Sequence, residues 1–241
     1  QILRRPAGCV GAQIMLCQSW GVQKRVLPLF LAATVAAALS ACGDANQSAG
    51  PDVQQVNGVE CAYPPEGEPA RTVDPPDSEN VADKGTVTAT LNMTAGDVTI
   101  TMDRAKAPCT VNSFVSLVEQ GYFDDTDCHR LTDYGIFVLQ CGDPTATGTG
   151  GPGYTIPDEV DKSLTYPAGT VAMANRGTKD TGGSQFFLVW ADTELPPTYT
   201  VFGTIDQAGL DVVGGIAAQG VDAGDQTSPI AEAKITGVTL G

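Results

Sequence analysis

The chain has 241 residues, with 13 Lys and Arg against 28 Asp and Glu, and its formal net charge is −15. This charge argues against a nucleic-acid partner, because such binders need a basic face to displace counterions. The single histidine excludes any metal site with two or more His ligands, and the 28 glycines and 16 prolines favour turn-rich β structure over a helical bundle.

Residues 1–41 are predicted to be an export signal, with extra upstream sequence at its start. They carry four basic side chains and no acid, and a short apolar run, 26–39, follows a basic pair. This order is typical of a secretory signal, and a run of this length is too short to cross a ~30 Å hydrocarbon core. The run closes with Leu-Ser-Ala before Cys42, which resembles the lipobox of bacterial lipoproteins, whose cysteine is diacylated. The alternative is an uncleaved signal anchor in which Cys42 is incidental.

Residues 42–84 are predicted to be a disordered, Pro-rich, acidic linker that follows the lipid anchor. The segment holds six prolines and many acidic and amide side chains, and it shows no apolar periodicity. Such a composition buries too little apolar surface to offset the entropy of ordering, and it suits a spacer that holds a domain off a membrane. Cys61 is the exception and could tie the linker down.

From residue 85 onward the pattern predicts one domain of short strands and two helices. Apolar residues alternate with polar ones on both sides of Gly96, which predicts a β-hairpin. Helical spacing follows over 107–120, with Pro108 near the start and Gly121 just past the end. Further elements are expected as strands at 136–140, 170–174, 185–189 and 199–203, a helix at 208–218, and a last strand at 234–240. This order predicts a closed β-barrel capped by helices over residues 85–241.

Several common kinds of site are not supported by the motifs. The Gly-rich stretch 148–153 lacks the Gly-Lys-Ser/Thr ending of a phosphate-binding loop, so we interpret it as a surface loop. No nucleophile elbow accompanies His129, which is interpreted as structural. Four cysteines remain beyond Cys42, namely Cys61, Cys109, Cys128 and Cys141; in an exported protein they predict two disulfides with three possible connectivities.

Three stretches, 128–143, 173–187 and 199–203, mix buried-type apolar residues with isolated polar ones. They indicate a pocket that binds an apolar group and grips a neutral polar backbone. The stretches resemble the cyclophilin family of peptidyl-prolyl cis-trans isomerases, with its Phe-His-Arg and Phe-Met-x-Gln-Gly-Gly-Asp motifs. The matching segments are Cys128-His129-Arg130, Phe137 to Asp143, Met173-Ala174-Asn175, Gly183 to Phe187 and Val201-Phe202-Gly203.

The resemblance covers about residues 85–241 and implies a mainly β fold, an eight-stranded antiparallel barrel closed by two α-helices. The implied activity is acceleration of Xaa-Pro bond rotation without cofactor or metal. Arg130, Phe137 and Gln140 would be catalytic, with Arg130 interacting with the prolyl amide. The remaining substrate-binding residues implied by the family are Val138, Ala174, Asn175, Gln185, Phe187, Leu195 and Tyr199.

The lipobox and spacer further resemble membrane-anchored actinobacterial cyclophilins. This implies a folding helper that is lipid-anchored on the outer face of the cytoplasmic membrane. Its partners would be unfolded or extended proline-containing polypeptides and the membrane itself, with no nucleic acid, and a monomer is expected. Cys128 and Cys141 flank an expected hairpin, so we hypothesise that they pair, while Cys61–Cys109 would staple the linker to the first helix. Four buried free thiols are the alternative.

The chain departs from the family pattern near the expected pocket. Leu195 stands where many eukaryotic members have Trp, and the turn between Arg130 and Phe137 is two residues longer. We expect activity to survive and cyclosporin-type binding to weaken. These departures leave a second hypothesis open, a catalytically weak proline-peptide binding module or scaffold on the cell surface.

Overall fold

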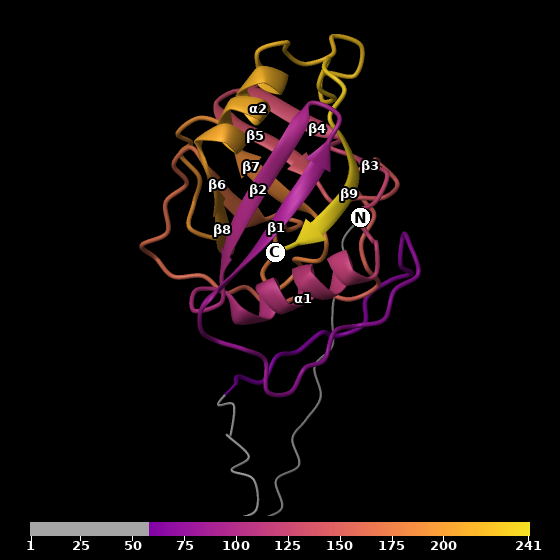
Figure 1. The fold of residues 1–241 in the computed structure, drawn as a ribbon, viewed down its shortest axis with the longest axis vertical. Helices are drawn as coiled ribbons and strands as arrows, with labels where there is room; N and C mark the ends of the chain where they lie inside the picture. The colour runs from indigo at the N-terminus through magenta and orange to yellow at the C-terminus, as the bar shows by residue number, and fades with distance from the viewer. Residues whose placement is uncertain (1–57) are drawn as a thin grey trace, which may run out of the picture. The chain divides into compact units, whose positions relative to one another are not determined.

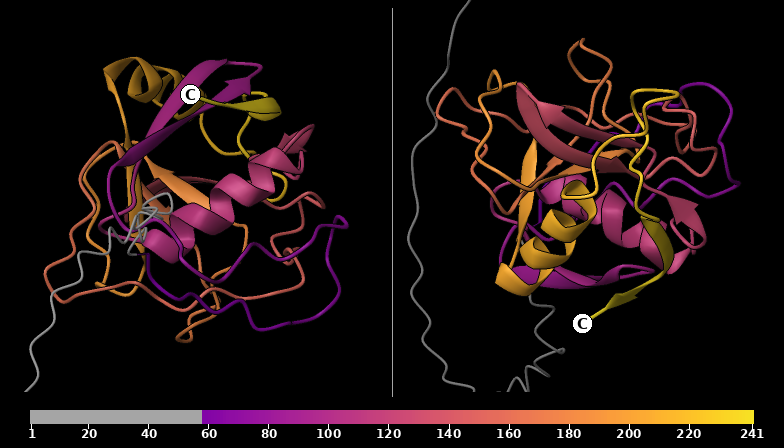
Figure 2. Two further views of the ribbon diagram at one scale, coloured as in Figure 1. Left: turned by 60° about the horizontal axis from the view of Figure 1, so that its bottom comes forward. Right: turned by 90° about the horizontal axis from the view of Figure 1, so that it is seen from above.

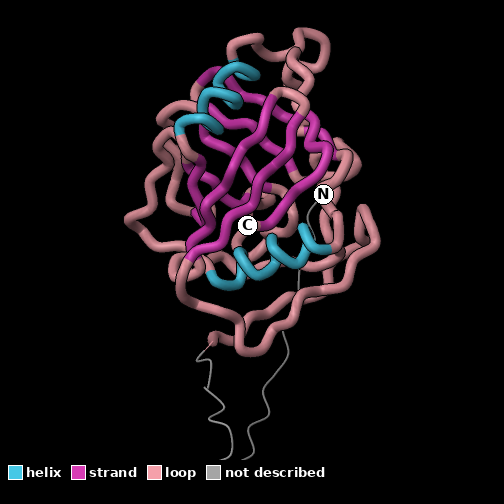
Figure 3. The backbone as a smooth tube through the Cα atoms, viewed as in Figure 1, coloured by secondary structure: helices cyan, strands magenta, loops and turns pink. Residues whose placement is uncertain are grey.

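The computed structural model describes residues 58–241, which form one curled sheet with two helices (Figures 1 and 3). The strands are β1 Thr86–Met93, β2 Gly96–Asp103, β3 Thr126–Asp127, β4 Arg130–Tyr134, β5 Ile136–Cys141, β6 Thr170–Met173, β7 Phe186–Val189, β8 Val201–Ile205 and β9 Lys234–Leu240. The helices are α1 Pro108–Glu119 and α2 Gln207–Ala217. In Figure 1, α1 lies below the strands and α2 above them.

The nine strands form one sheet in the order β3-β9-β1-β2-β8-β6-β7-β5-β4, and every neighbouring pair is antiparallel. The sequence predicted a mainly β fold with two helices, which is confirmed. The predicted number of eight strands is one too low, because β3 has two residues and pairs only with the end of β9. A strand of that length carries no alternation that a sequence pattern could reveal.

The two edges of the sheet, β3 and β4, are neighbours along the chain. Only Cys128 and His129 separate them, but the two strands do not pair with each other, so the sheet is a curled half-barrel rather than the predicted closed barrel. The Cys128 N–H donates to the carbonyl of Ala233 at 2.8 Å, and a disulfide joins Cys128 to Cys141 in β5. The hypothesised pairing of these two cysteines is confirmed.

The core forms on the inner face of the sheet, as the alternation along β1 and β2 predicted. Phe114 of α1 is 1% exposed and lies at its centre. Its ring is stacked on Phe123 at 4.9 Å and lies 5.3 Å from Phe186 and 5.4 Å from Phe202. Aromatic contacts of this kind add to the free energy of burial, so they fix α1 against β7 and β8.

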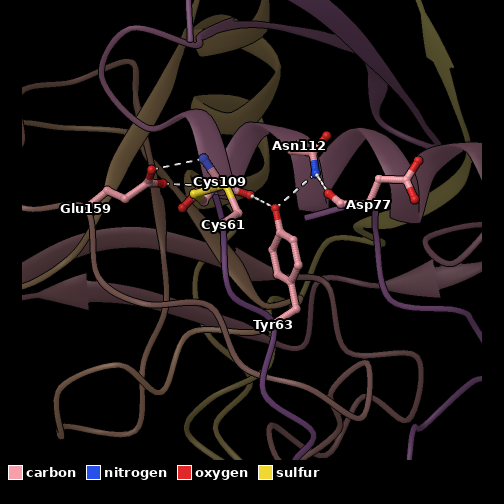
Figure 4. Close-up of a disulfide and its surroundings, with 7 residues drawn as sticks. Cys61, Tyr63, Asp77, Cys109, Asn112 and Glu159 are labelled. Atoms are coloured by element: carbon pink, nitrogen blue, oxygen red, sulfur yellow. Dashed lines mark hydrogen bonds between the residues drawn. A yellow bond between two sulfur atoms is a disulfide. The ribbon is translucent and has the colours of Figure 1, made fainter. Parts of the chain in front are cut away.

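Free N–H groups at the start of both helices have hydrogen-bond partners. Pro108 stands in the first turn of α1, where it has no N–H to leave unpaired. The Glu159 carboxylate accepts from the N–H groups of Cys109 at 2.9 Å and Thr110 at 2.8 Å, as Figure 4 shows for Cys109. The Asp206 side chain caps α2 by accepting from Gly209 at 2.9 Å.

Residues 58–84, hereafter the strap, correct the linker prediction: they pack along α1 rather than standing free of the domain (Figures 1 and 2). Arg71 donates to the carbonyls of Gly121 at 2.8 Å, Tyr122 at 3.0 Å and Asp124 at 2.8 Å. Val81 is only 5% exposed. A few specific anchors, rather than a broad apolar face, hold the strap, and the composition of a segment does not reveal such anchors.

The strap is also tied covalently to α1 by the Cys61–Cys109 disulfide, which confirms the second hypothesised pairing. Figure 4 shows its surroundings. The Tyr63 hydroxyl donates to the Cys109 carbonyl at 3.0 Å and accepts from Asn112 at 3.0 Å, and Asn112 also donates to the Asp77 carbonyl at 2.8 Å. Burial raises the pKa of Tyr63 to about 12, so its hydroxyl stays a donor at neutral pH.

We expect replacement of both Cys61 and Cys109 by Ser to lower the free energy of unfolding by about 4 kcal/mol. The bridge spans a sequence separation of 48 residues, and a cross-link of that length removes about this much loop entropy from the unfolded chain. Urea unfolding of the oxidised protein and the double variant measures the difference. A loss below ~1 kcal/mol would show that the strap is held without the bridge.

Candidate active site

A small cavity of about 100 Å³ opens between the ends of β4, β5, β7 and the loop before β8. Most of the residues predicted for the site line it. They are Arg130, Val138, Gln140, Ala174, Asn175, Phe187, Leu195 and Tyr199, with Ile136 in addition. Residues more than 60 positions apart in the chain are therefore brought together by the antiparallel pairing of β5 with β4 and β7.

Phe137 does not line this cavity, which corrects its predicted place in the site. Successive side chains of a strand point to opposite faces, so Phe137 must face away from Val138 and Gln140. Its ring instead lies edge-on to Trp190, with centroids 5.0 Å apart. Ile136, which sequence reasoning missed, takes the position on the cavity side, and counting back in twos from Gln140 would have found it.

The polar side of the cavity is a chain of hydrogen bonds that begins at Arg130. The residue directly opposite Arg130 on β5 is Gln140, whose Oε1 accepts from the guanidinium at 3.2 Å. Gln140 Nε2 donates to Gln185 at 2.8 Å, and Gln185 donates to the carbonyl of Gly150 at 2.9 Å. Gln185 therefore acts on the cavity through Gln140, and the chain of amides holds the guanidinium at the cavity wall.

The apolar side of the cavity belongs to a second buried cluster, separate from the main core. Its buried members are Val138, Tyr166, Ala172, Phe187 and Val189. Partly buried Ile136, Leu195 and Tyr199 pack against it. The rings of Phe187 and Tyr199 meet edge to face with centroids 5.5 Å apart, and they form one wall of an apolar slot that suits a small aliphatic ring.

Tyr166 holds the loop that carries Leu195 and Tyr199, a role that no sequence motif indicated. Its hydroxyl donates to the carbonyls of Tyr199 at 3.0 Å and Pro196 at 3.3 Å and accepts from the N–H of Tyr199 at 3.1 Å. Burial raises the pKa of Tyr166, so the donor is kept at neutral pH. The loop is thereby fixed against the second cluster.

Asn175 lines the small cavity. Its side chain is engaged elsewhere, because Nδ2 donates to the carbonyl of Thr198 at 2.9 Å and Oδ1 accepts from Gly177 at 3.0 Å. Within residues 58–241 its own N–H and C=O make no hydrogen bond. An extended peptide could pair with these groups.

Asp143 and His129 belong to the same motif region but do not line the small cavity. Asp143 is 0% exposed and accepts from Thr145 at 2.8 Å and from Gly150 at 3.0 Å. Burial raises the pKa of Asp143, but these hydrogen bonds outweigh it, so the pKa is lowered. Neither ring nitrogen of His129 has a hydrogen-bond partner in the described part of the chain, and burial lowers its pKa against the opposing effect of Asp143.

The arrangement can bind a small apolar ring beside a fixed cation and a free peptide edge. No serine, cysteine or histidine side chain lines the small cavity. Across residues 58–241 no group of three or more metal-ligating side chains occurs. The Arg130 guanidinium and the apolar side chains that line the cavity can bind an amide without a covalent bond and polarise it.

Residues 87–240 match the model of the cyclophilin-type peptidyl-prolyl cis-trans isomerase/CLD family. The chain is 45% identical over 199 residues to the protein of Mycobacterium leprae named "Probable peptidyl-prolyl cis-trans isomerase B", with 76% of this chain and 67% of that one covered. The Mycobacterium tuberculosis protein of the same name is 43% identical, with 76% and 64% covered. The chain thus spans about two thirds of the length of these relatives.

Among solved structures, the fold is similar to a cyclophilin-type peptidyl-prolyl cis-trans isomerase of Cryptosporidium parvum. The TM-score is 0.58 at 27% sequence identity, and the match covers 65% of this chain and 98% of that one. The same Cryptosporidium protein in the presence of the dipeptide Ala-Pro matches with a TM-score of 0.57.

We expect the pKa of His129, the only histidine, to lie below 6.5 in the folded protein. The unfolded chain takes up this proton near pH 6.5 and the folded protein only at lower pH, so the free energy of unfolding falls as the pH drops below about 6.5. Titration of the single imidazole resonance measures the pKa. His129→Gln should remove this part of the pH dependence, and a pKa above 6.5 would contradict the burial argument.

Proposed function

This chain belongs to the cyclophilin family of peptidyl-prolyl cis-trans isomerases, and we propose that it accelerates Xaa-Pro bond rotation in exported proteins, as a folding helper outside the cytoplasmic membrane. The observation that carries the proposal is the small cavity itself. It sets an apolar slot beside the Arg130 guanidinium and the free main chain of Asn175. These are the groups that a proline ring, its amide and the preceding residue would need.

Rotation about a prolyl amide needs no covalent step. The barrier is ~18–20 kcal/mol because resonance across the C–N bond is lost in the twisted state. Uncatalysed exchange takes roughly tens of seconds or more. A protein lowers this barrier by binding the twisted amide more tightly than either planar isomer. A rigid slot for the ring and a fixed donor for the amide supply that difference.

Arg130 is the proposed donor to the twisted amide. A guanidinium stays charged at every relevant pH and offers forked N–H donors. Its hydrogen bond to Gln140 uses Nη1, so other N–H groups stay available to a peptide. Because the partial charge on the amide changes as it twists, a cation held in place before reaction favours the twisted state.

The proline ring would occupy the slot between Phe187, Leu195 and Val138, with Tyr199 at the rim. Ile136 takes the part of the wall that the sequence had assigned to Phe137. The peptide would run past Asn175, whose free N–H and C=O could pair with the residue before proline. Gln140 would orient Arg130 and touch the peptide backbone.

Export and lipid anchoring are part of the proposal and rest on residues 1–57, which lie outside the described residues. The basic and apolar order of 1–41 and the lipobox-like sequence before Cys42 support them. The two disulfides suit an oxidising compartment. Neither helix within residues 58–241 is long and apolar enough to cross a membrane. The proposed protein is a monomer tethered by Cys42 that acts on unfolded proline-containing polypeptides.

A binding module of weak activity remains the second candidate. It is favoured by Leu195 in the slot and by the turn between β4 and β5. That turn is made at Gly135, with φ of +76°, and carries Tyr134 at 92% exposure. Such a module would bind proline peptides through the same slot without accelerating exchange.

We expect Arg130→Ala to lower kcat/KM for isomerisation of an Xaa-Pro peptide at least tenfold, or about 1.4 kcal/mol of barrier. Arg104→Ala is the matched control, because Arg104 lines neither the small cavity nor the larger one beside it. The rate of cis-to-trans exchange, followed by NMR, is the measurement. If wild type and Arg130→Ala both bind proline peptides but neither accelerates exchange, the binding-module function holds instead.

We expect Cys42→Ser to release the protein from membranes when it is expressed in a mycobacterial host. Loss of the diacylated cysteine removes the lipid anchor. Cys17→Ser, upstream in the proposed signal segment, is the control and should remain in the membrane fraction. Fractionation and intact mass measure both variants; an unlipidated wild type that keeps residues 1–41 would support the uncleaved signal anchor instead.

A further inference from the structure

A second and larger cavity, of about 600 Å³, adjoins the small one and shares Gln140, Ala174 and Asn175 with it. Loop residues 148–155 form one wall, and Glu66, Gly67 and Glu68 of the strap form another. A cavity of this size is large enough for several side chains of a peptide. The two cavities share Gln140, Ala174 and Asn175, so a peptide that enters one can continue into the other.

The strap is fixed as a wall of this cavity by its main chain. The N–H of Glu66 donates to the carbonyl of Gly153 at 2.8 Å, and the N–H of Ala70 donates to Gly151 at 2.8 Å. In the opposite direction, the N–H of Thr155 in the loop donates to the carbonyl of Pro64 at 3.0 Å. The disulfide at Cys61 anchors the strap before this stretch, and Arg71 anchors it after.

The strap lies outside the family domain. The family model begins at residue 87, whereas the mycobacterial matches cover 76% of this chain. The mycobacterial likeness must therefore include residues before Val87. This wall of the cavity is an addition to the domain rather than a property of the family as a whole.

The added wall carries an excess of negative charge. The acidic and basic side chains that line the cavity are Glu66, Glu68 and Arg176. Arg176 forms an ion pair with Glu66. Glu68 is exposed and has neither a hydrogen bond nor an ion pair within residues 58–241. Its carboxylate is therefore free to meet a cation that enters the cavity.

We propose that Glu68 of the strap gives the larger cavity, as a subsite for the residues before the proline, a preference for a basic side chain. The inference rests on the proposed function, which places the proline ring in the small cavity and the preceding residue at Asn175. The residues before that one then lie in the larger cavity, beside the strap. Glu66 and Arg176 set the balance of charge there, since each neutralises the other.

The test is isomerisation of matched peptides by the full-length protein, with Lys, Gln or Glu placed two or three residues before the proline. We expect kcat/KM to favour Lys over Glu by about two- to fivefold at low salt, the range of one exposed ion pair, and less at high salt. Glu68→Gln should abolish the preference and Glu68→Lys should reverse it. Glu66→Gln should shift the preference toward Glu by freeing Arg176.

Glu79→Gln is the matched control, because Glu79 is an exposed strap carboxylate that does not line the cavity. The control should keep the wild-type preference. Equal rates on Lys and Glu peptides, or an equal effect of Glu79→Gln and Glu68→Gln, would overturn the subsite while leaving the isomerase intact. If no peptide is isomerised, the proposed function fails, and the dissociation constants of the same peptides then test the subsite. Tighter binding of the Lys peptide that is lost in Glu68→Gln supports the subsite. Equal affinities for the Lys and Glu peptides overturn it.

Discussion

The pairing of Arg130 on β4 with Gln140 on β5 is the contact on which the candidate site depends. A guanidinium beside an apolar slot has few polar neighbours, and it keeps one orientation only if a neighbour accepts from it. Gln140 accepts, and Gln185 and Gly150 in turn fix Gln140. A shift of one residue between β4 and β5 would carry Gln140 to the other face of the strand and leave Arg130 without this partner.

The register is protected by covalent and packing constraints close to that pair. The Cys128–Cys141 disulfide lies just beside it, where the chain passes between the two edges of the sheet. On the other side, β5 pairs with β7, and Gln140 stands opposite Phe187. The two faces of β5 therefore pack against different clusters. Leu139 and Cys141 belong to the main core, and Val138 belongs to the second cluster beside the slot.

Much of this architecture could be predicted from the sequence, because most strands are long enough to show alternation. The hairpin of β1 and β2, both helices and the last strand follow from local periodicity and from Pro108, Gly96 and Gly121. The motifs bring Arg130 and Gln140 together at the cavity, where they stand opposite each other on β4 and β5. Phe137 belongs to the same motif but does not line the cavity, because the period of two along β5 turns it to the face opposite Val138 and Gln140.

The strap could not be predicted from composition, since its order comes from partners that are distant in sequence. Cys61 bonds to Cys109, Arg71 to three carbonyls after α1, and Glu66 to Gly153. Each contact joins residues far apart in the sequence, so it leaves no periodic pattern along the chain. Tyr166 was missed for the same reason, because its hydroxyl acts on a loop about 30 residues away.

The strap also changes how the domain and its proposed tether are related. A free linker would leave the cavity beside the active site open, whereas a strap bonded along 151–155 encloses it with carboxylates. The anchors that hold the strap include a disulfide, and disulfides persist in oxidising compartments. In the proposed setting outside the membrane, the conditions that keep Cys61 bonded to Cys109 are those that keep the wall of the larger cavity in place.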